Sequence, residues 1–301
     1  MQMHASQLTV DVTVVRDLVS RQFPRWAPLP VRKIESTGTV NAIFRIGEDL
    51  AARFPLQPAD VALTRQRLES EAAAARELAG RTAFRTPDPV AIGEPGAGYP
   101  LPWSVRTWLP GTVATEHEAG NSDMFARDLA EFVRAVRAID TRGRTFDGTN
   151  RGGDLRAHDA WMEECFRRSD ELLDVAWLRR TWARLRTLPR TATDVITHGD
   201  LIPGNLLVAD GRLTGVLDVG GLAPADPALD VVIAWHGLAT GPRYLFRRIL
   251  GSDDLEWARG AAWAFEQAVG LVWYYAHSNA VMSRLGRRTL ARIAADPSVY
   301  G

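Results

Sequence analysis

The pattern of this chain changes at Pro110-Gly111, and that change constrains the fold more than any other feature. Before this point, short apolar runs separated by turn residues predict antiparallel strands. The expected strand regions are 31–55, 89–92 and 103–109. A helix is expected over about 58–79, with Pro58 in its first turn and Gly80 at its end.

The remainder of the chain is mostly helical in pattern. Helices are expected at 121–139, 155–168 and 171–187 and at several places beyond Asp226. In this part, only the segment 193–218 carries strand-like runs. The sequence therefore predicts an α+β fold with a small antiparallel-sheet lobe, residues 1–108, and a larger, mainly helical lobe, residues 109–301.

Composition limits the partners of the chain. Basic and acidic residues number 36 each, so no net charge favours nucleic acid or an anionic membrane as a partner. Cys165 is the only cysteine, which excludes an internal disulfide framework and a multi-cysteine metal site. We interpret Cys165 as a buried thiol, and we leave open whether the protein is a monomer or a homodimer.

A cytoplasmic location is expected from the apolar segments. The N-terminus lacks a basic stretch followed by an apolar run, so no secretory signal is expected. The most apolar late stretch, 261–281, is interrupted by Glu266, Gln267 and His277. These polar residues are typical of a packed helix and not of a membrane span.

The strongest chemical signal is a polar loop that holds His198, Asp200 and Asn205. The chain beyond this loop turns back at Asp210-Gly211, which is a strong two-residue hairpin signal. With this turn at its centre, the hairpin places Asp218 opposite the loop. The sequence thus predicts that two carboxylates and an amide gather at strand ends.

This combination fits phosphoryl transfer. Mg²⁺ prefers oxygen ligands, and the reaction needs a carboxylate that orients the attacking hydroxyl. We expect Asn205 and Asp218 to hold Mg²⁺ and Asp200 to receive the hydroxyl proton. His198 is placed with the catalytic residues, where we expect it to orient the loop through a hydrogen bond. The alternative is that Asp200 and Asn205 are ordinary turn residues.

These motifs resemble those of the aminoglycoside phosphotransferase family. The catalytic loop of that family is similar to the run His-Gly-Asp-x-x-x-x-Asn at 198–205, and its metal-binding aspartate is similar to Asp218. The resemblance extends to the Asp-Pro-x-x-Asp segment at 226–230 and to the strand and hinge at 103–111. It implies a two-lobed protein-kinase-like fold in which residues 1–108 bind the nucleotide and residues 109–301 carry catalysis and acceptor binding.

The resemblance also implies an activity. This is the Mg²⁺-dependent transfer of the γ-phosphate of ATP or GTP to a hydroxyl of a small molecule, foremost an aminoglycoside-like or other antibiotic. Antibiotic resistance and metabolism both stay open as the biological role. Within the Asp-Pro-x-x-Asp segment, we interpret Asp226 as a helix N-cap before Pro227. Asp230 faces either the helix amides or the catalytic loop, and we favour a structural role.

The resemblance implies a strand cation that clamps phosphates and is held by a helix carboxylate. Arg53 and Glu71 are the candidates, because Glu71 shares the apolar face of its helix and an inward carboxylate needs a partner. Arg53 stands where kinases have a lysine, and Lys33, the only lysine, lies too early to replace it. The alternative pairs Glu71 with Arg67.

Two further segments complete the expected nucleotide site. Gly38 lies in a loop that would cover the phosphates, although an ordinary hairpin turn is almost as good an interpretation. The backbone of Thr107, Trp108 and Leu109 would bind adenine as the hinge. The alternative for Trp108 is that it packs between the lobes.

The sequence says least about the acceptor site. Acidic residues that would suit a cationic drug are Glu163, Glu164, Asp253, Asp254, Glu256 and Glu266. We expect each of them separately to be an ordinary solvated charge. An aromatic cluster at Trp273, Tyr274, Tyr275 and His277 is expected to pack in the core.

Two other functions compete with a small-molecule kinase. A catalytically inactive nucleotide-binding sensor on the same fold would explain the missing strand lysine and the plain glycine loop. A protein kinase would need His-Arg-Asp where the chain has His198-Gly199-Asp200, and Phe-Gly where it has Val219-Gly220. It would also need an Ala-Pro-Glu segment, which the sequence lacks.

Overall fold

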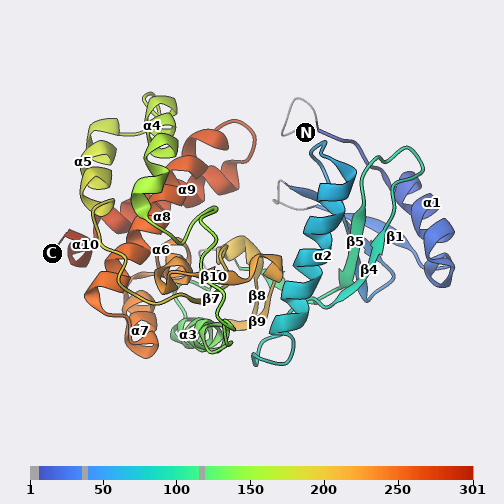
Figure 1. The fold of residues 1–301 in the computed structure, drawn as a ribbon, viewed down its shortest axis with the longest axis horizontal. Helices are drawn as coiled ribbons and strands as arrows, with labels where there is room; N and C mark the ends of the chain where they lie inside the picture. Colours follow the sequence, from blue (N-terminus) through green and yellow to red (C-terminus); the bar gives the residue numbers. More distant parts are fainter. Residues whose placement is uncertain (1–6, 36–39, 115–118, 301) are drawn as a thin grey trace. The chain divides into compact units, whose positions relative to one another are not determined.

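The structure is a computed structural model that describes residues 7–35, 40–114 and 119–300. The chain forms two compact units, and both are coloured along the sequence in Figure 1. The first unit comprises 1–80, 85–110 and 216–220, and the second comprises 81–84, 111–215 and 221–301.

The first unit is built on a five-stranded antiparallel sheet with strand order β1–β2–β3–β5–β4. The strands are β1 Val31–Ile34, β2 Asn41–Ile46, β3 Leu50–Pro55, β4 Pro89–Gly93 and β5 Trp103–Thr107. This result confirms the predicted strand regions. Gly47 turns the chain between β2 and β3 with φ of +59°, a conformation that favours glycine.

The two faces of this sheet differ because successive residues of a strand point to opposite faces. One face is apolar and packs with α1 (Val12–Gln22) and η1 (Pro24–Trp26) into the core of the unit. The largest fully buried side chains there are Phe44, Phe54, Tyr99 and Trp103. Helix α1 contributes Val15, Leu18 and Val19 to this core.

The opposite face of the sheet carries arginines. Arg53 pairs with Ser104 across β3 and β5, and Ala51 pairs with Arg106, so both arginines point to one side. Helix α2 (Val61–Leu78) contacts β4 and β5 on this side. The sheet therefore lies between α1 and α2 (Figure 1).

Helix α2 begins later than expected. The side chain of Asp60 accepts a hydrogen bond from the N–H of Leu63 at 2.9 Å and caps the helix. Pro58 thus lies before the cap, and its placement in the first turn is wrong. Gly80 follows the end of the helix with φ of +71°, as expected of a stop signal.

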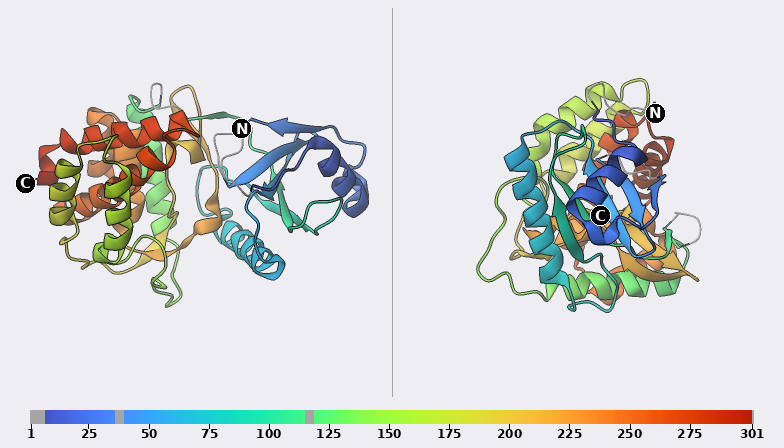
Figure 2. Two further views of the ribbon diagram at one scale, coloured as in Figure 1. Left: turned by 90° about the horizontal axis from the view of Figure 1, so that it is seen from above. Right: turned by 90° about the vertical axis from the view of Figure 1, so that its right-hand side faces the viewer.

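The second unit is mainly helical (Figure 2). Its α-helices are α3 Asp123–Arg137, α4 Asp159–Arg168, α5 Val175–Leu185, α6 Val232–Gly237, α7 Thr240–Leu250, α8 Asp254–Tyr274, α9 Ala280–Ala294 and α10 Pro297–Tyr300. This unit also contains the short 3₁₀ turns η2 Leu155–His158, η3 Pro203–Asn205 and η5 Pro227–Val231. Helix α8 is central because it packs on α9, α4, α6 and η5.

Two small sheets interrupt the helices of the second unit. β7 (Val195–Thr197) pairs with β10 (Ala223–Ala225), and β8 (Leu206–Ala209) lies between β6 (Thr112–Val113) and β9 (Arg212–Val216). The strands β6 and β10 were not expected, because two or three residues are too few to show a period. The predicted turn is confirmed: Asp210 and Gly211 have φ of +51° and +70°, as in a type I′ hairpin.

The expectation that Cys165 is buried is met. Cys165 is buried, and burial raises the pKa of its thiol to about 12. Among the helices of the described residues, none is both long and apolar enough to span a membrane.

Candidate active site

One carboxylate holds the backbone of the loop that follows β7. Asp230, fully buried in η5, accepts hydrogen bonds from the backbone N–H of His198 at 2.8 Å and of Gly199 at 3.0 Å. Gly199 has φ of +80°, which a residue with a side chain rarely adopts. Of the two orientations that the sequence left open for Asp230, the structure shows the one toward this loop.

The loop is fixed from within by His198 and Asn205. The buried imidazole of His198 accepts a hydrogen bond at Nδ1 from the backbone N–H of Asp200, at 3.3 Å. The amide nitrogen of Asn205 donates to the backbone oxygen of Asp200 at 2.9 Å and to its carboxylate Oδ2 at 3.0 Å. The expected hydrogen bond through which His198 orients the loop is therefore present, and Asp200 stays exposed at its tip.

Asp226 has the structural role expected of it. Its Oδ1 accepts a hydrogen bond from the N–H of Ala228 at 2.9 Å and caps η5, with Pro227 in the first turn. Its Oδ2 binds the buried guanidinium of Arg259 at 2.5 Å. This buried ion pair holds the base of η5, and η5 in turn carries Asp230.

A second cluster of charges lies on α2 and the arginine face of the sheet in the first unit. The carboxylate of Glu71 binds Nη2 of Arg106 at 2.5 Å, whereas its contacts to Arg53 and Arg67 are 3.9 and 3.8 Å long. Arg53 instead donates through Nη2 to Asp218 at 3.0 Å. The expected ion pair between Arg53 and Glu71 is therefore present only at 3.9 Å, and the close partner of Glu71 is Arg106, which was not expected.

The physical reason is the register of β3 and β5. Arg106 lies on the same face as Arg53 but is almost fully buried, with a side-chain exposure of 5 %. Burial lowers the pKa of its guanidinium, and the nearby charge of Arg53 adds to this effect. The more deeply buried arginine needs a carboxylate more than Arg53, whose side chain is 16 % exposed, and Glu71 is the carboxylate within its reach.

The segment after Asp218 packs tightly on α2. Asp218 has φ of +54°, in the left-handed region where aspartate is tolerated better than most residues. A Cβ atom at Gly220 would lie 2.6 Å from Cγ of Glu71, so only glycine fits there. The sequence Asp218-Val219-Gly220 therefore brings the carboxylate of Asp218 to Arg53.

The expected hinge offers fewer donors than predicted. The N–H of Thr107 donates to the backbone oxygen of Asp88 at 2.9 Å, and that of Trp108 donates to the oxygen of Asp49 at 2.7 Å. Trp108 packs its ring under the guanidinium of Arg45, 4.9 Å from the ring centre. Among the described residues, nothing takes the N–H of Leu109. Gly38 lies outside the described residues.

The residues expected to hold Mg²⁺ have suitable donor atoms. Because the amide nitrogen of Asn205 is committed to Asp200, its carbonyl oxygen is the atom that can meet a cation. Asp218 is a half-exposed carboxylate already paired with a cation, Arg53. Within the described ranges, no three His, Cys, Asp or Glu side chains form a metal cluster of their own. Asn205 belongs to the second unit and Asp218 to the first, and each offers oxygen donors of the kind that Mg²⁺ binds together with phosphate and water.

Sequence reasoning missed Arg106. The signal was available, since a lone charge in the apolar strand Trp103–Thr107 is unusual and implies a buried partner. The sequence also indicated a structural role for Asp230, but it did not predict that Asp230 binds the loop at 198–205. No local signal could show this contact, because 31 residues separate Asp230 from Gly199.

The acidic residues considered for a cationic acceptor are almost all bound to arginine. The pairs are Glu163 with Arg179, Glu164 with Arg167 and Arg168, Asp254 with Arg247, Glu256 with Arg137 and Glu266 with Arg151. Asp253 caps α8. The solvated-charge expectation is wrong for Glu266, which is only 2 % exposed and lies inside α8 among helices.

The expectation that the aromatic cluster near residue 274 is core is also wrong. Tyr274 is 43 % exposed and His277 is exposed, while Trp273 and Tyr275 are half-buried. The reason is that α8 ends at Tyr274, beyond the region where neighbouring helices cover it on all sides. Exposed rings of this size call for an explanation.

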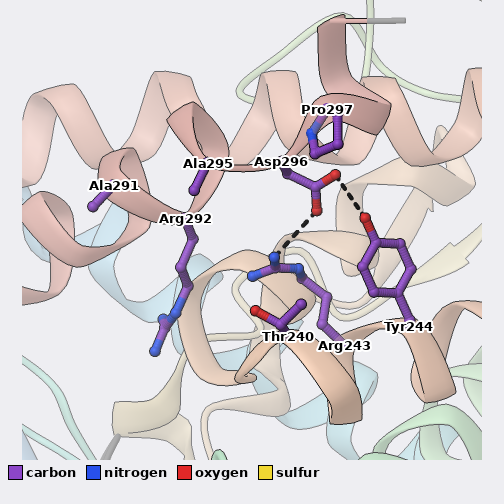
Figure 3. Close-up of a pocket in the computed structure, with 8 residues that line it drawn as sticks. All are labelled: Thr240, Arg243, Tyr244, Ala291, Arg292, Ala295, Asp296 and Pro297. Atoms are coloured by element: carbon purple, nitrogen blue, oxygen red, sulfur yellow. Dashed lines mark hydrogen bonds and ion pairs between the residues drawn. The ribbon is translucent and has the colours of Figure 1, made fainter.

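A hollow of about 300 Å³ in the second unit contains none of the predicted site residues (Figure 3). It is lined by Thr240, Arg243, Tyr244, Ala291, Arg292, Ala295, Asp296 and Pro297. Asp296 accepts hydrogen bonds from Arg243 at 3.1 Å and from Tyr244 at 2.8 Å. These bonds join α7 to the end of α9, so we interpret the group as structural.

An antiparallel sheet with a helix-borne glutamate and a helical unit with a fixed His-Gly-Asp loop are the two parts of a kinase-like phosphotransferase. The sequence matches the model of the phosphotransferase enzyme family over residues 31–265. The chain belongs to this family.

Related sequences support the assignment of this chain to the phosphotransferase family. An aminoglycoside 3'-phosphotransferase of Streptomyces fradiae is 33 % identical over 181 residues, 52 % of this chain and 64 % of that protein. One from Escherichia coli is 27 % identical over 154 residues, 49 % of this chain and 56 % of that protein. The matches thus span about half to just under two thirds of the length of these relatives.

Solved structures show the fold. The GDP complex of aminoglycoside 2'-phosphotransferase-IIIa superposes with a TM-score of 0.73 at 20 % identity, covering 95 % of this chain and 99 % of that one. The macrolide 2'-phosphotransferase MphH of Brachybacterium faecium gives a TM-score of 0.62 at 20 % identity, covering 93 % and 98 %. The α+β, two-lobed kinase-like fold expected from the sequence is confirmed.

Proposed function

We propose that this protein transfers the γ-phosphate of ATP or GTP to a hydroxyl of a small molecule, an aminoglycoside-like or other antibiotic. The observation that carries the proposal is the loop at 198–205, whose exposed carboxylate, Asp200, is held by Asn205 while Asp230 and His198 fix the backbone. A turn without a catalytic task would not need three side chains to fix it. Residues 1–108 would bind the nucleotide, and residues 109–301 would bind the acceptor.

Each residue of the site has a proposed role. Asp200 orients the acceptor hydroxyl and takes its proton, and Asn205 keeps that carboxylate in place. Asn205 and Asp218 also present oxygen atoms to Mg²⁺, which supplies neutralisation of the phosphate charge. His198 and Asp230 position the loop and do not touch the reacting atoms.

On the nucleotide side, Arg53 is the proposed phosphate ligand. Arg53 is bound to Asp218 at 3.0 Å and lies 3.9 Å from Glu71. Its guanidinium can exchange these carboxylates for the oxygens of a phosphate, which it binds in the same bidentate manner. Arg106 holds Glu71 in place. Leu109 is the proposed hinge donor to adenine, with Thr107 and Trp108 shaping the hinge and Gly38 in the covering loop.

The donor, acceptor and cellular setting are inferred in part from relatives. Proteins of this fold have been solved with GDP, with ADP and with ATP plus streptomycin, which supports a nucleoside triphosphate as the donor. The curated relatives carry the name aminoglycoside phosphotransferase, which supports an antibiotic as the acceptor. We propose a cytoplasmic monomer or homodimer without nucleic acid or membrane partners.

The experiment that tests the proposal is Mg²⁺-dependent ADP release with a panel of hydroxylated antibiotics. We expect acceptor-stimulated release by the wild type and its loss in Asp200→Ala, because the hydroxyl then has no base. Nucleotide affinity, measured by calorimetry, should change little in this variant. Full activity of Asp200→Ala would remove Asp200 from the mechanism. Nucleotide binding without any turnover would favour the inactive sensor.

A further inference from the structure

The hollow drawn in Figure 3 carries more positive than negative charge. Arg243 of α7 and Arg292 of α9 line it, and Asp296 is the carboxylate that shares it with them. Its volume of about 300 Å³ is at the lower end of the range of small-molecule sites. Two guanidinium groups and one carboxylate leave one positive charge in excess in this hollow.

The carboxylate of Asp296 is fully used by its neighbours. It is buried and accepts hydrogen bonds from Arg243 at 3.1 Å and from the hydroxyl of Tyr244 at 2.8 Å. The backbone N–H and the hydroxyl of Ser298 donate to it at 3.0 and 2.6 Å. Four hydrogen bonds are about what a carboxylate accepts, so these structural contacts leave Asp296 no capacity for Arg292.

Arg292 has no counterion among the residues that the structure describes. Its Nη1 donates to the backbone oxygens of Trp235 at 2.9 Å and of His236 at 2.8 Å, and no carboxylate pairs with it. The side chain is half-buried, and burial lowers the pKa of its guanidinium to about 10. The nearby charges of Arg243 and Arg288 add to this effect. Because a partly buried charge without a counterion is costly, an anion in the hollow would be stabilised.

Arg243 has donors that the ion pair with Asp296 does not use. Its side chain is 3 % exposed, and its guanidinium lies 4.8 Å from the ring centre of Trp235. Within the described part of the chain, neither Nε nor Nη1 of Arg243 has an acceptor. Buried donors normally have partners, so unused donors in the wall of a hollow indicate a ligand with acceptor atoms.

The first turn of α7 borders the same hollow. The helix begins after Ala239, which has no side-chain oxygen to cap it. Thr240 lines the hollow, and neither its N–H nor its hydroxyl has a partner in the described ranges. The start of a helix attracts anions through its N–H groups and its dipole. The hollow therefore presents donors from two helices, which suits a tetrahedral oxyanion.

Arg292 also connects this hollow to the catalytic loop. The two carbonyl groups that it binds belong to α6, at Trp235 and His236. Gly237 ends α6, and a Cβ atom there would lie 3.6 Å from Cγ of Pro203 in the catalytic loop. A ligand that binds Arg292 would therefore act on the end of a helix that contacts this loop.

We propose that the hollow is a second binding site, which takes a phosphate group through Arg243, Arg292 and the first turn of α7. Guanidinium groups bind phosphate oxygens in a bidentate manner, and phosphate neutralises the charge of Arg292. The phosphate group is either free phosphate or that of a small phosphomonoester, for which the hollow has room. The inference does not depend on the phosphotransferase function, because the hollow shares no residue with the candidate active site.

The test is calorimetric titration with inorganic phosphate and with glycerol 3-phosphate. Arg292→Gln should weaken binding of both at least about tenfold, since a charged donor is lost. Arg284→Gln, which changes an exposed arginine of the same helix, is the matched control and should leave the affinity unchanged. Arg53→Ala removes the proposed phosphate ligand of the first unit and should still bind phosphate as the wild type does. Phosphate at about 100 times its Kd should raise Tm by about 5 °C.

A second variant tests the site without removing a side chain that holds α6. Thr240→Glu places a carboxylate in the first turn of α7, where the helix dipole favours it. This carboxylate should neutralise the hollow and weaken phosphate binding at least about tenfold. Val281→Glu, in the first turn of α9 and at a position 49 % exposed, is its control. It introduces the same charge at another helix start and should leave phosphate affinity unchanged.

Hydrogen exchange locates the bound ion. Phosphate should slow exchange in segments 232–243 and 288–296, which surround the hollow. Tighter binding of glycerol 3-phosphate than of phosphate would assign the site to a phosphomonoester, and equal or weaker binding would assign it to the free ion. No phosphate binding by Arg53→Ala, equal affinities of Arg292→Gln and Arg284→Gln, or slowed exchange only in the first unit would overturn the proposal.

Discussion

The ion pair between Glu71 and Arg106 gives the sharpest prediction about the first unit. Side-chain exposures of 23 % and 5 % and a separation of 2.5 Å place Arg106 inside the protein with one close carboxylate. Glu71→Ala would leave the guanidinium buried without that partner. Breaking a buried pair in this way costs about 3–5 kcal/mol. Because Glu71 is partly exposed and Asp218 also acts on Arg106, we expect a loss near 3 kcal/mol.

The assay is unfolding in urea and by heat, followed by circular dichroism. A loss of about 3 kcal/mol corresponds to a fall in Tm on the order of 10 °C for a unit of this size. Glu69→Ala, on the exposed side of the same helix, is the matched control and should cost less than about 0.5 kcal/mol. Equal stability of Glu71→Ala and Glu69→Ala would refute the buried ion pair. Glu71→Gln should keep part of the stability, because the amide oxygen of the glutamine still accepts a hydrogen bond from Arg106.

Three further predictions concern the second unit. Asp230→Ala should lower kcat about 100-fold and stability by about 3 kcal/mol, because it leaves one buried and one partly buried N–H group without their acceptor. Asp230→Asn should retain part of both kcat and stability. The pKa of buried His236 is lowered to about 4, below that of an unfolded histidine, so protonation favours unfolding. Between pH 7 and pH 5 the wild type should therefore lose about 2 kcal/mol of stability, and His236→Gln should not show this loss. An equal loss for the two proteins in urea unfolding would contradict the prediction. Burial raises the pKa of Cys165 to about 12, so at pH 8 a thiol reagent should label it only after unfolding; rapid labelling of the native protein would show that it is accessible.

Much of the fold could be read from the sequence because its signals are local. Turn residues such as Asp210-Gly211 fix φ within one or two residues, and Gly80 ends α2 through its own left-handed conformation. The same holds for the N-cap at Asp226. Local signals failed where elements were short, as for β6 and β10, or where capping by Asp60 overrode the proline preference at the start of α2.

In the candidate site, too, the features that depend on nearby residues were predicted and those that depend on distant residues were not. The spacing His198-Gly199-Asp200 to Asn205 is a property of the sequence, because a loop of this length closes on itself and lets the Asn205 amide reach Asp200. The partner of Glu71 was predicted less well. The lone charge in strand β5 indicated that Arg106 needs a buried partner, but only the fold shows that Arg106 is closer to Glu71 than Arg53 or Arg67 is.

The sequence by itself determined the strands of the first unit, the change to a mainly helical pattern, the hairpin turn and the polar loop, since each depends on residues that are close along the chain. Only the tertiary structure decided that Arg106 holds Glu71, that Asp230 fixes the catalytic loop, and that Tyr274 is exposed. These outcomes depend on burial, which is set by elements far apart in sequence. A charge finds the partner that compensates the cost of its own burial, and that cost exists only once the chain has folded.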